Sequence, residues 1–171
     1  MTTIVAIEGR GKVTIAADSR VTGSSINDGW VQKIVQNGDF TFAAAGHLRA
    51  IQVLEFAHLP QPPATNEDGA IVRFVSVELV PAIVTAFSTA KADDAKNQSV
   101  LLAIVRGRVY DIYGGDGAWV RSPRGLYALG SGSRYALGAL EAGATAEQAI
   151  KIASLYDWGT NGTVTVKEVT A

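Results

Sequence analysis

Thr2 is the residue with the clearest potential for chemistry, because it follows the initiator methionine and begins the run Thr2-Thr3-Ile4-Val5-Ala6. A threonine hydroxyl inside a chain is a weak nucleophile at neutral pH, but an N-terminal threonine has its own α-amine beside it. That amine has a reference pKa of about 7.7–8.0, which suits a general base. Removal of Met1 would therefore create an N-terminal nucleophile, although a threonine after methionine more often has no such role.

Two charged residues occur where buried strands are expected. Asp18 ends an apolar strand, where a carboxylate is costly unless it is paired. Lys33 interrupts another strand on the same face as Val31 and Val35, although a lysine there could simply extend to solvent. If Asp18 and Lys33 point toward each other and toward Thr2, the carboxylate holds the ammonium. The ammonium then lowers the pKa of the nearby hydroxyl and amine.

Three further residues could complete such a site. Gly46 lies where a strand should end and a helix begin, so its N–H could bind an oxyanion, or it could be an ordinary turn glycine. Ser131 lies between two glycines and could approach the N-terminal amine and move a proton, or only form a tight turn. Asp157 follows an apolar helix and could orient the amine or cap the turn Gly159-Thr160-Asn161-Gly162.

Hydrophobic patterns predict the elements that position these residues. Strands are expected over residues 2–8, 12–18, 30–36, 40–45, 99–105, 108–113, 118–121, 127–129 and 163–169. Helices are expected after Gly46 and over about 70–91, 133–142 and 146–157. Asn37-Gly38 is a strong hairpin signal. Pro81 should kink or split the second helix, and Thr145 with Gln148 forms a capping-box pattern for the last one.

This order of elements predicts an α+β fold. Two groups of hairpin-linked strands should form antiparallel sheets, and each helix pair must cover an apolar face. The expected architecture is a four-layer αββα sandwich of two antiparallel sheets flanked by helix pairs, with residues 1–171 forming one domain.

Composition narrows the class of protein. The chain has 171 residues, 47% of them hydrophobic, and a formal net charge of −1. Without a dense basic stretch, nucleic acid is not an expected partner. The absence of cysteine excludes disulfides, thiolate metal sites and a cysteine nucleophile. We found no secretion signal and no apolar run of the roughly 20 residues that span a bilayer, so a cytoplasmic protein with no membrane partner is expected.

Several segments together resemble the β-subunit superfamily of the proteasome, and most closely the bacterial HslV-type peptidases. The matching segments are Thr2-Thr3-Ile4-Val5, Ala17-Asp18-Ser19-Arg20-Val21-Thr22, Val31-Gln32-Lys33-Ile34, Ala45-Gly46, residues 129–143 and residues 157–162. They follow in the right order over nearly the whole chain. The sandwich expected from the patterns is also the fold that this resemblance implies.

The resemblance implies roles for individual residues. Thr2 corresponds to the nucleophile, Asp18 and Lys33 to its charged support, and Gly46 to the oxyanion hole. Ser131 and Asp157 correspond to residues around the amine, and Thr160 occupies a position where other members tend to have serine. Residues that should line the substrate pocket are Val21, Thr22, Ala44 and Arg49. No metal or cofactor is expected in the chemistry.

Three functions remain open. The leading one is a threonine-type endopeptidase acting on polypeptides in stacked homo-oligomeric rings, with an ATP-dependent unfoldase as a possible partner. The second is a catalytically silent ring or scaffold subunit that keeps Met1. The third is an N-terminal nucleophile amidase that acts on a small amide.

Overall fold

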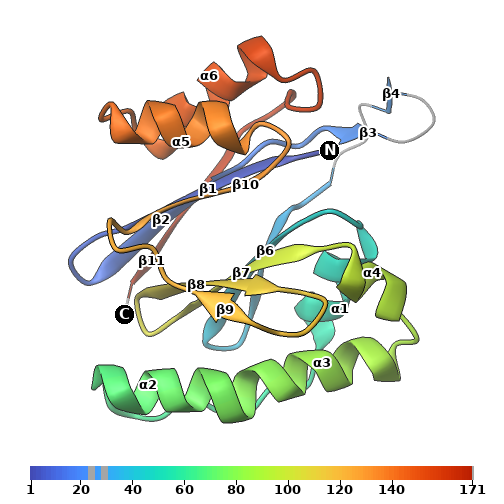
Figure 1. The fold of residues 1–171 in the computed structure, drawn as a ribbon, viewed down its shortest axis with the longest axis vertical. Helices are drawn as coiled ribbons and strands as arrows, with labels where there is room; N and C mark the ends of the chain where they lie inside the picture. The colour runs from blue at the N-terminus through green and yellow to red at the C-terminus, as the bar shows by residue number, and fades with distance from the viewer. Residues whose placement is uncertain (23–25, 28–30, 171) are drawn as a thin grey trace.

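Two antiparallel sheets stack face to face, with helices covering both outer faces (Figure 1). The computed structural model describes residues 1–22, 26–27 and 31–170. The first sheet has the order β10-β1-β2-β11 and the second the order β5-β6-β7-β8-β9. This arrangement confirms the predicted α+β, four-layer αββα sandwich.

The strands of the first sheet are β1 (Thr3–Glu8), β2 (Lys12–Ala17), β10 (Leu126–Gly130) and β11 (Thr165–Thr170). Those of the second are β5 (Ile34–Asn37), β6 (Phe40–Ala45), β7 (Val100–Val105), β8 (Arg108–Tyr113) and β9 (Trp119–Val120). A short ribbon pairs β3 (Val21–Thr22) with β4 (Ile26–Asn27). The strand predicted over 30–36 begins only at Ile34, so Lys33 precedes it, and Trp30 lies outside the described residues.

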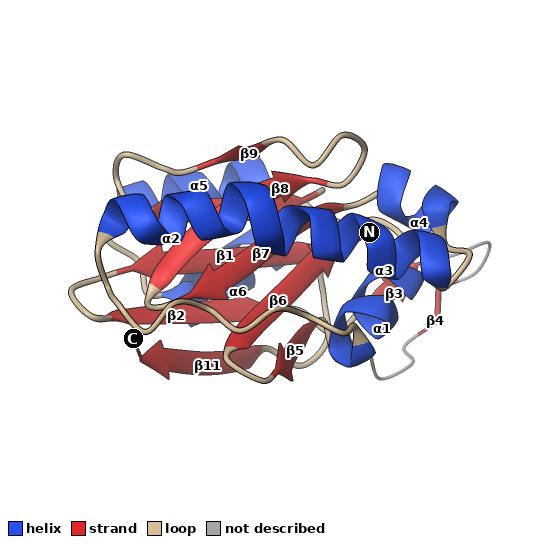
Figure 2. Ribbon diagram, turned by 90° about the horizontal axis from the view of Figure 1, so that it is seen from below, coloured by secondary structure: helices blue, strands red, loops and turns tan. Residues whose placement is uncertain are grey.

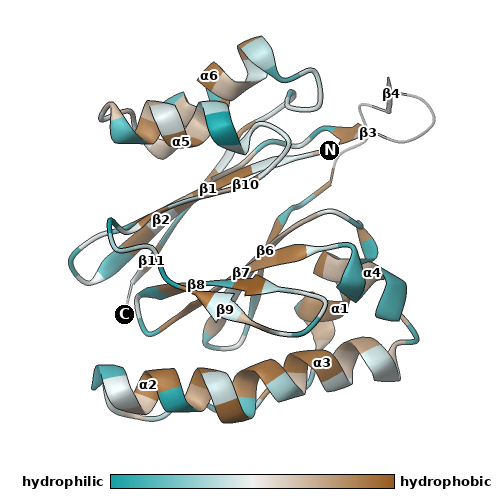
Figure 3. Ribbon diagram, viewed as in Figure 1, coloured by the Kyte–Doolittle hydropathy of each residue, from teal (hydrophilic) through white to brown (hydrophobic). Residues whose placement is uncertain are grey.

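Alternation along β1 explains why it is buried on both sides. Ile4 and Ala6 pack in the core between the two sheets, whereas Val5 packs under the outer helices α5 (Ser133–Glu141) and α6 (Ala146–Tyr156). Successive strand residues point to opposite faces, so a sheet between two layers needs apolar residues at both sets of positions. Figure 3 shows the resulting hydrophobic colouring along the central strands.

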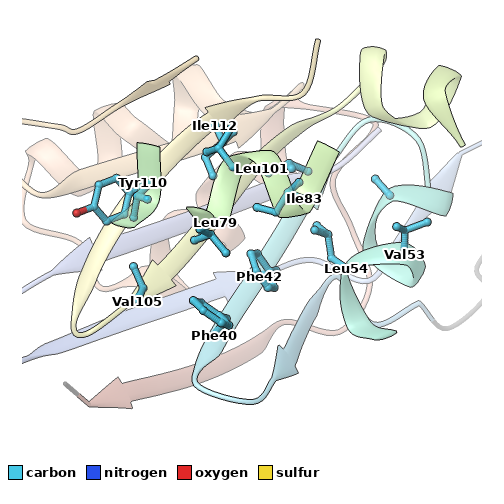
Figure 4. Packing of buried hydrophobic residues seen from close by; sticks show 14 of the residues in the cluster. Phe40, Phe42, Val53, Leu54, Leu79, Ile83, Leu101, Val105, Tyr110 and Ile112 are labelled. Carbon is cyan, nitrogen blue, oxygen red and sulfur yellow. The ribbon is translucent and has the colours of Figure 1, made fainter. Parts of the chain in front are cut away.

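The second sheet is covered on its outer face by α1 (Arg49–Phe56), α4 (Asp93–Asn97) and a long helix made of α2 (Asp68–Phe74), η1 (Val75–Leu79) and α3 (Val80–Thr89). Phe40, Phe42, Leu54, Leu79 and Ile83 lie together in the core between sheet and helices (Figure 4). The short helix α4 was not predicted from the sequence.

Pro81 does not end the long helix, which crosses the outer face of the sheet without a break (Figure 2). The segment before it, Val75–Leu79, is π-helical, and Pro81 lies in the first turn of the α-helix that resumes at Val80. A proline lacks the N–H for a helical hydrogen bond and crowds the preceding turn. The wider π-turn accommodates both effects, so the helix changes type where a kink or split was predicted.

The long helix also corrects the statement, made from the sequence, that no apolar run has the roughly 20 residues that span a bilayer. Its 22 residues, Asp68–Thr89, are long and apolar enough to cross a membrane by length and composition. In this fold Ile71, Phe74, Leu79 and Ile83 are instead buried against the second sheet. The helix is therefore a layer of the sandwich here.

The capping box of α6 is confirmed. The Thr145 hydroxyl accepts a hydrogen bond from the Gln148 backbone N–H at 3.2 Å, and the Gln148 side chain accepts one from the Thr145 N–H at 2.9 Å. These reciprocal bonds satisfy two donors that a helix start otherwise leaves unpaired. They fix the start of the helix whose far end places Asp157.

Candidate active site

Asp18 is the centre of a buried polar cluster at the end of β2. Its Oδ1 accepts hydrogen bonds from the Lys33 ammonium at 2.9 Å and from the Thr3 backbone N–H at 2.7 Å. Its Oδ2 accepts from the backbone N–H groups of Arg20 at 3.1 Å and Asn161 at 3.3 Å. The residue is only 2% exposed, so these donors offset the cost of removing a carboxylate from water.

Lys33 lies just before β5 and is directed into this cluster. Besides Asp18, its ammonium donates to the Arg20 carbonyl oxygen at 2.7 Å, and the side chain is 2% exposed. Burial lowers the pKa of Lys33, and the Asp18 carboxylate opposes that shift. Asp18 and Lys33 thus meet as the sequence analysis expected, although Lys33 comes from the segment before a strand.

Thr2 lies directly before β1 and is 5% exposed. Its hydroxyl donates to the Met1 carbonyl oxygen at 2.7 Å. The next residue, Thr3, binds Asp18 through its backbone N–H, so Thr2 is held one residue from the charged pair. On the other side, Thr3 pairs with Gly130 of β10. A Cβ at Gly130 would overlap the Thr2 carbonyl oxygen, so the strand approaches Thr2 this closely only with glycine.

The charges around the amino terminus act on its pKa. Burial lowers the pKa of the Met1 amine, and the Lys33 ammonium lowers it further. The carboxylates of Asp18 and Asp157 act in the opposite direction. The start of the chain therefore lies within the field of all three predicted charged residues.

A second polar cluster surrounds Asp157, the residue directly after α6. Its Oδ2 accepts hydrogen bonds from the Ser131 hydroxyl at 2.7 Å and from the Thr160 hydroxyl at 2.5 Å. The Thr160 hydroxyl is in turn hydrogen-bonded to the Thr3 hydroxyl. A Cβ at Gly132 would collide with the Thr3 hydroxyl, so the turn between β10 and α5 closes tightly over this cluster.

Gly46 is placed differently from the prediction. Helix α1 begins at Arg49, three residues later, so the prediction that Gly46 opens a helix is wrong. The residue has φ +121°, and a Cβ there would overlap the Gln98 carbonyl oxygen, so the bend requires glycine. Ala45 packs in the same inter-sheet core as Ile4 and Ala17, which brings the end of β6 to the side of the molecule where β1 begins (Figure 1).

The predicted substrate-pocket residues fall in separate surroundings. Val21 is half-buried in β3, and the side chain of Thr22 lies outside the described residues. Ala44 packs against the core beneath the helices. Arg49 lines a cavity of about 910 Å³ between α1 and α3, whose lining includes neither Thr2 nor the charged pair. The role of these residues in a substrate pocket stays a prediction.

A smaller cavity of about 300 Å³ reaches Asp18 from the side of α6. Its lining includes Ile150 of α6 and the turn residues Asn161, Gly162 and Thr163. This cavity is closer to the candidate active site than the larger one, because its lining includes Asp18 of the charged pair.

Thr3 is the member of the site that sequence reasoning missed. Its N–H binds Asp18 and its hydroxyl joins the Asp157 cluster, so this one residue connects the two polar groups. Strand alternation could have found it, because Thr3 shares a face with Val5, which packs under α5 and α6. A polar side chain on that face must find a partner at the end of these helices.

The chain is similar over its full length to solved structures that share one fold. BPH from Thiobacillus denitrificans, in complex with epoxomicin, is 21% identical with a TM-score of 0.71, and the match covers 99% of this chain and 98% of that one. A second structure of this BPH is 20% identical with a TM-score of 0.70 and the same coverage. HslV from Trypanosoma brucei is 23% identical with a TM-score of 0.69, covering 99% and 100%.

No family model matches the sequence, and no curated protein matches it. The likeness is therefore one of fold, and it extends over both sheets and both helix layers because the coverage is nearly complete. The resemblance suggested by the sequence motifs is confirmed at this level: the chain has the fold of HslV, the αββα sandwich of the proteasome β-subunit superfamily.

Proposed function

We propose that this protein is a threonine-type endopeptidase whose nucleophile is Thr2, exposed by removal of Met1. The observation that carries the proposal is the buried Asp18–Lys33 pair, joined at 2.9 Å and bonded to the backbone of the residue next to Thr2. A buried ion pair is weak evidence for stability by itself. A charged group with a perturbed pKa beside a candidate nucleophile, as Lys33 is, favours a functional role for the pair.

In the proposed reaction the Thr2 hydroxyl attacks a peptide carbonyl carbon while the Thr2 α-amine takes the hydroxyl proton. The Gly46 N–H stabilises the oxyanion, and the amine then returns its proton to the leaving amino group. Water hydrolyses the acyl-enzyme by the same route. The Lys33 ammonium favours the neutral amine and the developing alkoxide, which is the direction in which it acts on the Met1 amine.

Replacement of the nucleophile is the first test. Thr2→Ala should abolish cleavage of fluorogenic peptides and adduct formation with epoxomicin, the ligand of one structure with this fold, because it removes the attacking oxygen. The matched control is Thr170→Ala, an exposed threonine at the end of β11, which should leave both unchanged. Full activity of Thr2→Ala would overturn the assignment.

The intact mass of the purified protein distinguishes the proposed peptidase from a catalytically silent subunit that keeps Met1. One contact in the structure favours the silent subunit. The Met1 side chain packs against Gly159, where an added Cβ would collide with it, so the structure accommodates a retained methionine. The peptidase requires the mass of the chain without Met1. A retained Met1 together with no epoxomicin adduct would favour a scaffold subunit, and an adduct with turnover of small amides alone would favour an amidase.

The likeness in fold supports a proposed biological setting. We propose that copies of the chain assemble into stacked rings in the cytoplasm, with polypeptides as substrates and an ATP-dependent unfoldase as partner. Exposed apolar side chains support self-association: Phe56 is 82% exposed, Leu155 75% and Trp158 62%. The unfoldase rests on the fold likeness alone.

A further inference from the structure

The hydroxyls of Thr3, Thr160 and Ser131 form a chain that ends on the Asp157 carboxylate. Thr3 comes from the first strand, Ser131 from the turn after β10, and the other two from the turn after α6. Thr3 and Thr160 are each 0% exposed and Asp157 is 8% exposed. Ser131 is exposed, so three distant parts of the chain meet in a cluster whose inner members are buried and whose Ser131 end is open to solvent.

Counting protons sets the direction of each hydrogen bond. An ionised carboxylate only accepts, so the Ser131 and Thr160 hydroxyls both donate to Asp157 Oδ2. Each hydroxyl has one proton, so the Thr160 oxygen can only accept in its bond with Thr3. Thr3 is therefore the donor, and it is the first member of the chain.

The direction of these hydrogen bonds determines whether Ser131 can donate or only accept a further hydrogen bond. Its proton is committed to Asp157, which leaves its oxygen lone pairs for another donor. An added Cβ at Gly159 would collide with both Ser131 Oγ and the Met1 side chain, so the serine oxygen lies near the start of the chain. After loss of Met1, the donor available there is the Thr2 amine.

We infer that Thr3 is a positioning residue for catalysis, which acts through Thr160, Asp157 and Ser131 to orient the Thr2 amine. The Thr3 hydroxyl holds Thr160 in the rotamer that donates to Asp157, and the carboxylate held in this way fixes Ser131 as an acceptor. Bonds in such a chain strengthen one another in a buried site. This inference rests on the proposed function, because it concerns the base of that reaction.

Substitution of Thr3 by valine tests the inference, since it keeps the branched shape and removes the hydroxyl. Thr3→Val should lower kcat about ten-fold, part of the roughly 10²–10⁴-fold that a positioned general base supplies, with KM nearly unchanged. An ammonium that loses a fixed acceptor is less stable. The acid limb of the kcat/KM profile should therefore move to lower pH, a change that a loss of packing would not cause.

Conservative and control variants make the result specific. Thr3→Ser keeps the donor and should restore both kcat and the acid limb. Thr41→Val, which alters a threonine of β6 that is 4% exposed, should leave the acid limb in place. Wild-type behaviour of Thr3→Val, or equal impairment of Thr3→Ser and Thr3→Val, would overturn the inference.

Two further measurements keep the test decisive. If Thr3→Val does not fold, Thr160→Val interrupts the same chain and must shift the acid limb in the same direction; an unchanged limb would reject the inference. The pKa of the Thr2 amine, followed by NMR in Met1-free protein, should fall in either variant. A wild-type protein that neither cleaves peptides nor reacts with epoxomicin would refute the proposed function, while the amine pKa would still decide whether Thr3 acts on it.

Discussion

Asp18 and Lys33 depend on each other to different degrees. Without Lys33, the Asp18 carboxylate keeps the N–H donors of Thr3, Arg20 and Asn161. Without Asp18, the Lys33 ammonium loses its counter-charge and keeps the hydrogen bond to the Arg20 carbonyl oxygen. Asp18→Asn should thus lower the free energy of unfolding by about 3–5 kcal/mol, and Lys33→Met by less, as measured by urea denaturation. Lys12→Met, in an exposed pair with Glu168, should change it by less than about 1 kcal/mol. A larger loss for Lys33→Met would contradict this account.

Strand β10 brings the turn that contains Ser131 against the start of β1, and glycine permits the approach. Gly130 has φ +90°, and a Cβ there would overlap the Thr2 carbonyl oxygen. Gly130→Ala should therefore lower the free energy of unfolding by about 1–3 kcal/mol and displace Thr2, with loss of activity. Gly138→Ala is the matched control, because nothing lies near the added Cβ within α5; it should stabilise the protein by about 0.5–1 kcal/mol. Equal thermal stability of the two variants would contradict the argument.

Phe56 and Leu155 are among the large apolar side chains that the isolated protomer leaves in water. Phe56 lies at the end of α1, and Leu155 near the end of α6. Burying such a side chain contributes about 1.5–3 kcal/mol, so ring contacts should cover both. Phe56→Arg and Leu155→Arg should each lower the assembled mass in sedimentation experiments, while Arg10→Glu, in the exposed β1–β2 turn, should not. A wild-type protein that sediments as a stable monomer would exclude the proposed assembly.

The sequence predicts most of the architecture because the local hydrophobic and capping patterns agree with the surroundings that the same residues have in the folded protein. The β-rich run around Ile4 and Val5 predicts strand β1, and the Thr145–Gln148 pattern predicts the start of α6. Patterns fail where contacts from elsewhere decide the backbone. Gly46 bends against Gln98 instead of opening a helix, and the π-turn before Pro81 keeps the long helix continuous.

The sequence by itself determined the identities of the candidate reactive groups and the need of the Asp18 carboxylate for a partner, since an unpaired charge in an apolar strand is too costly. Only the tertiary structure decided that Thr3 connects Asp18 to the Asp157 cluster. Its partners lie up to 157 positions away along the chain, and hydrogen bonds depend on distance in space, which no local pattern encodes.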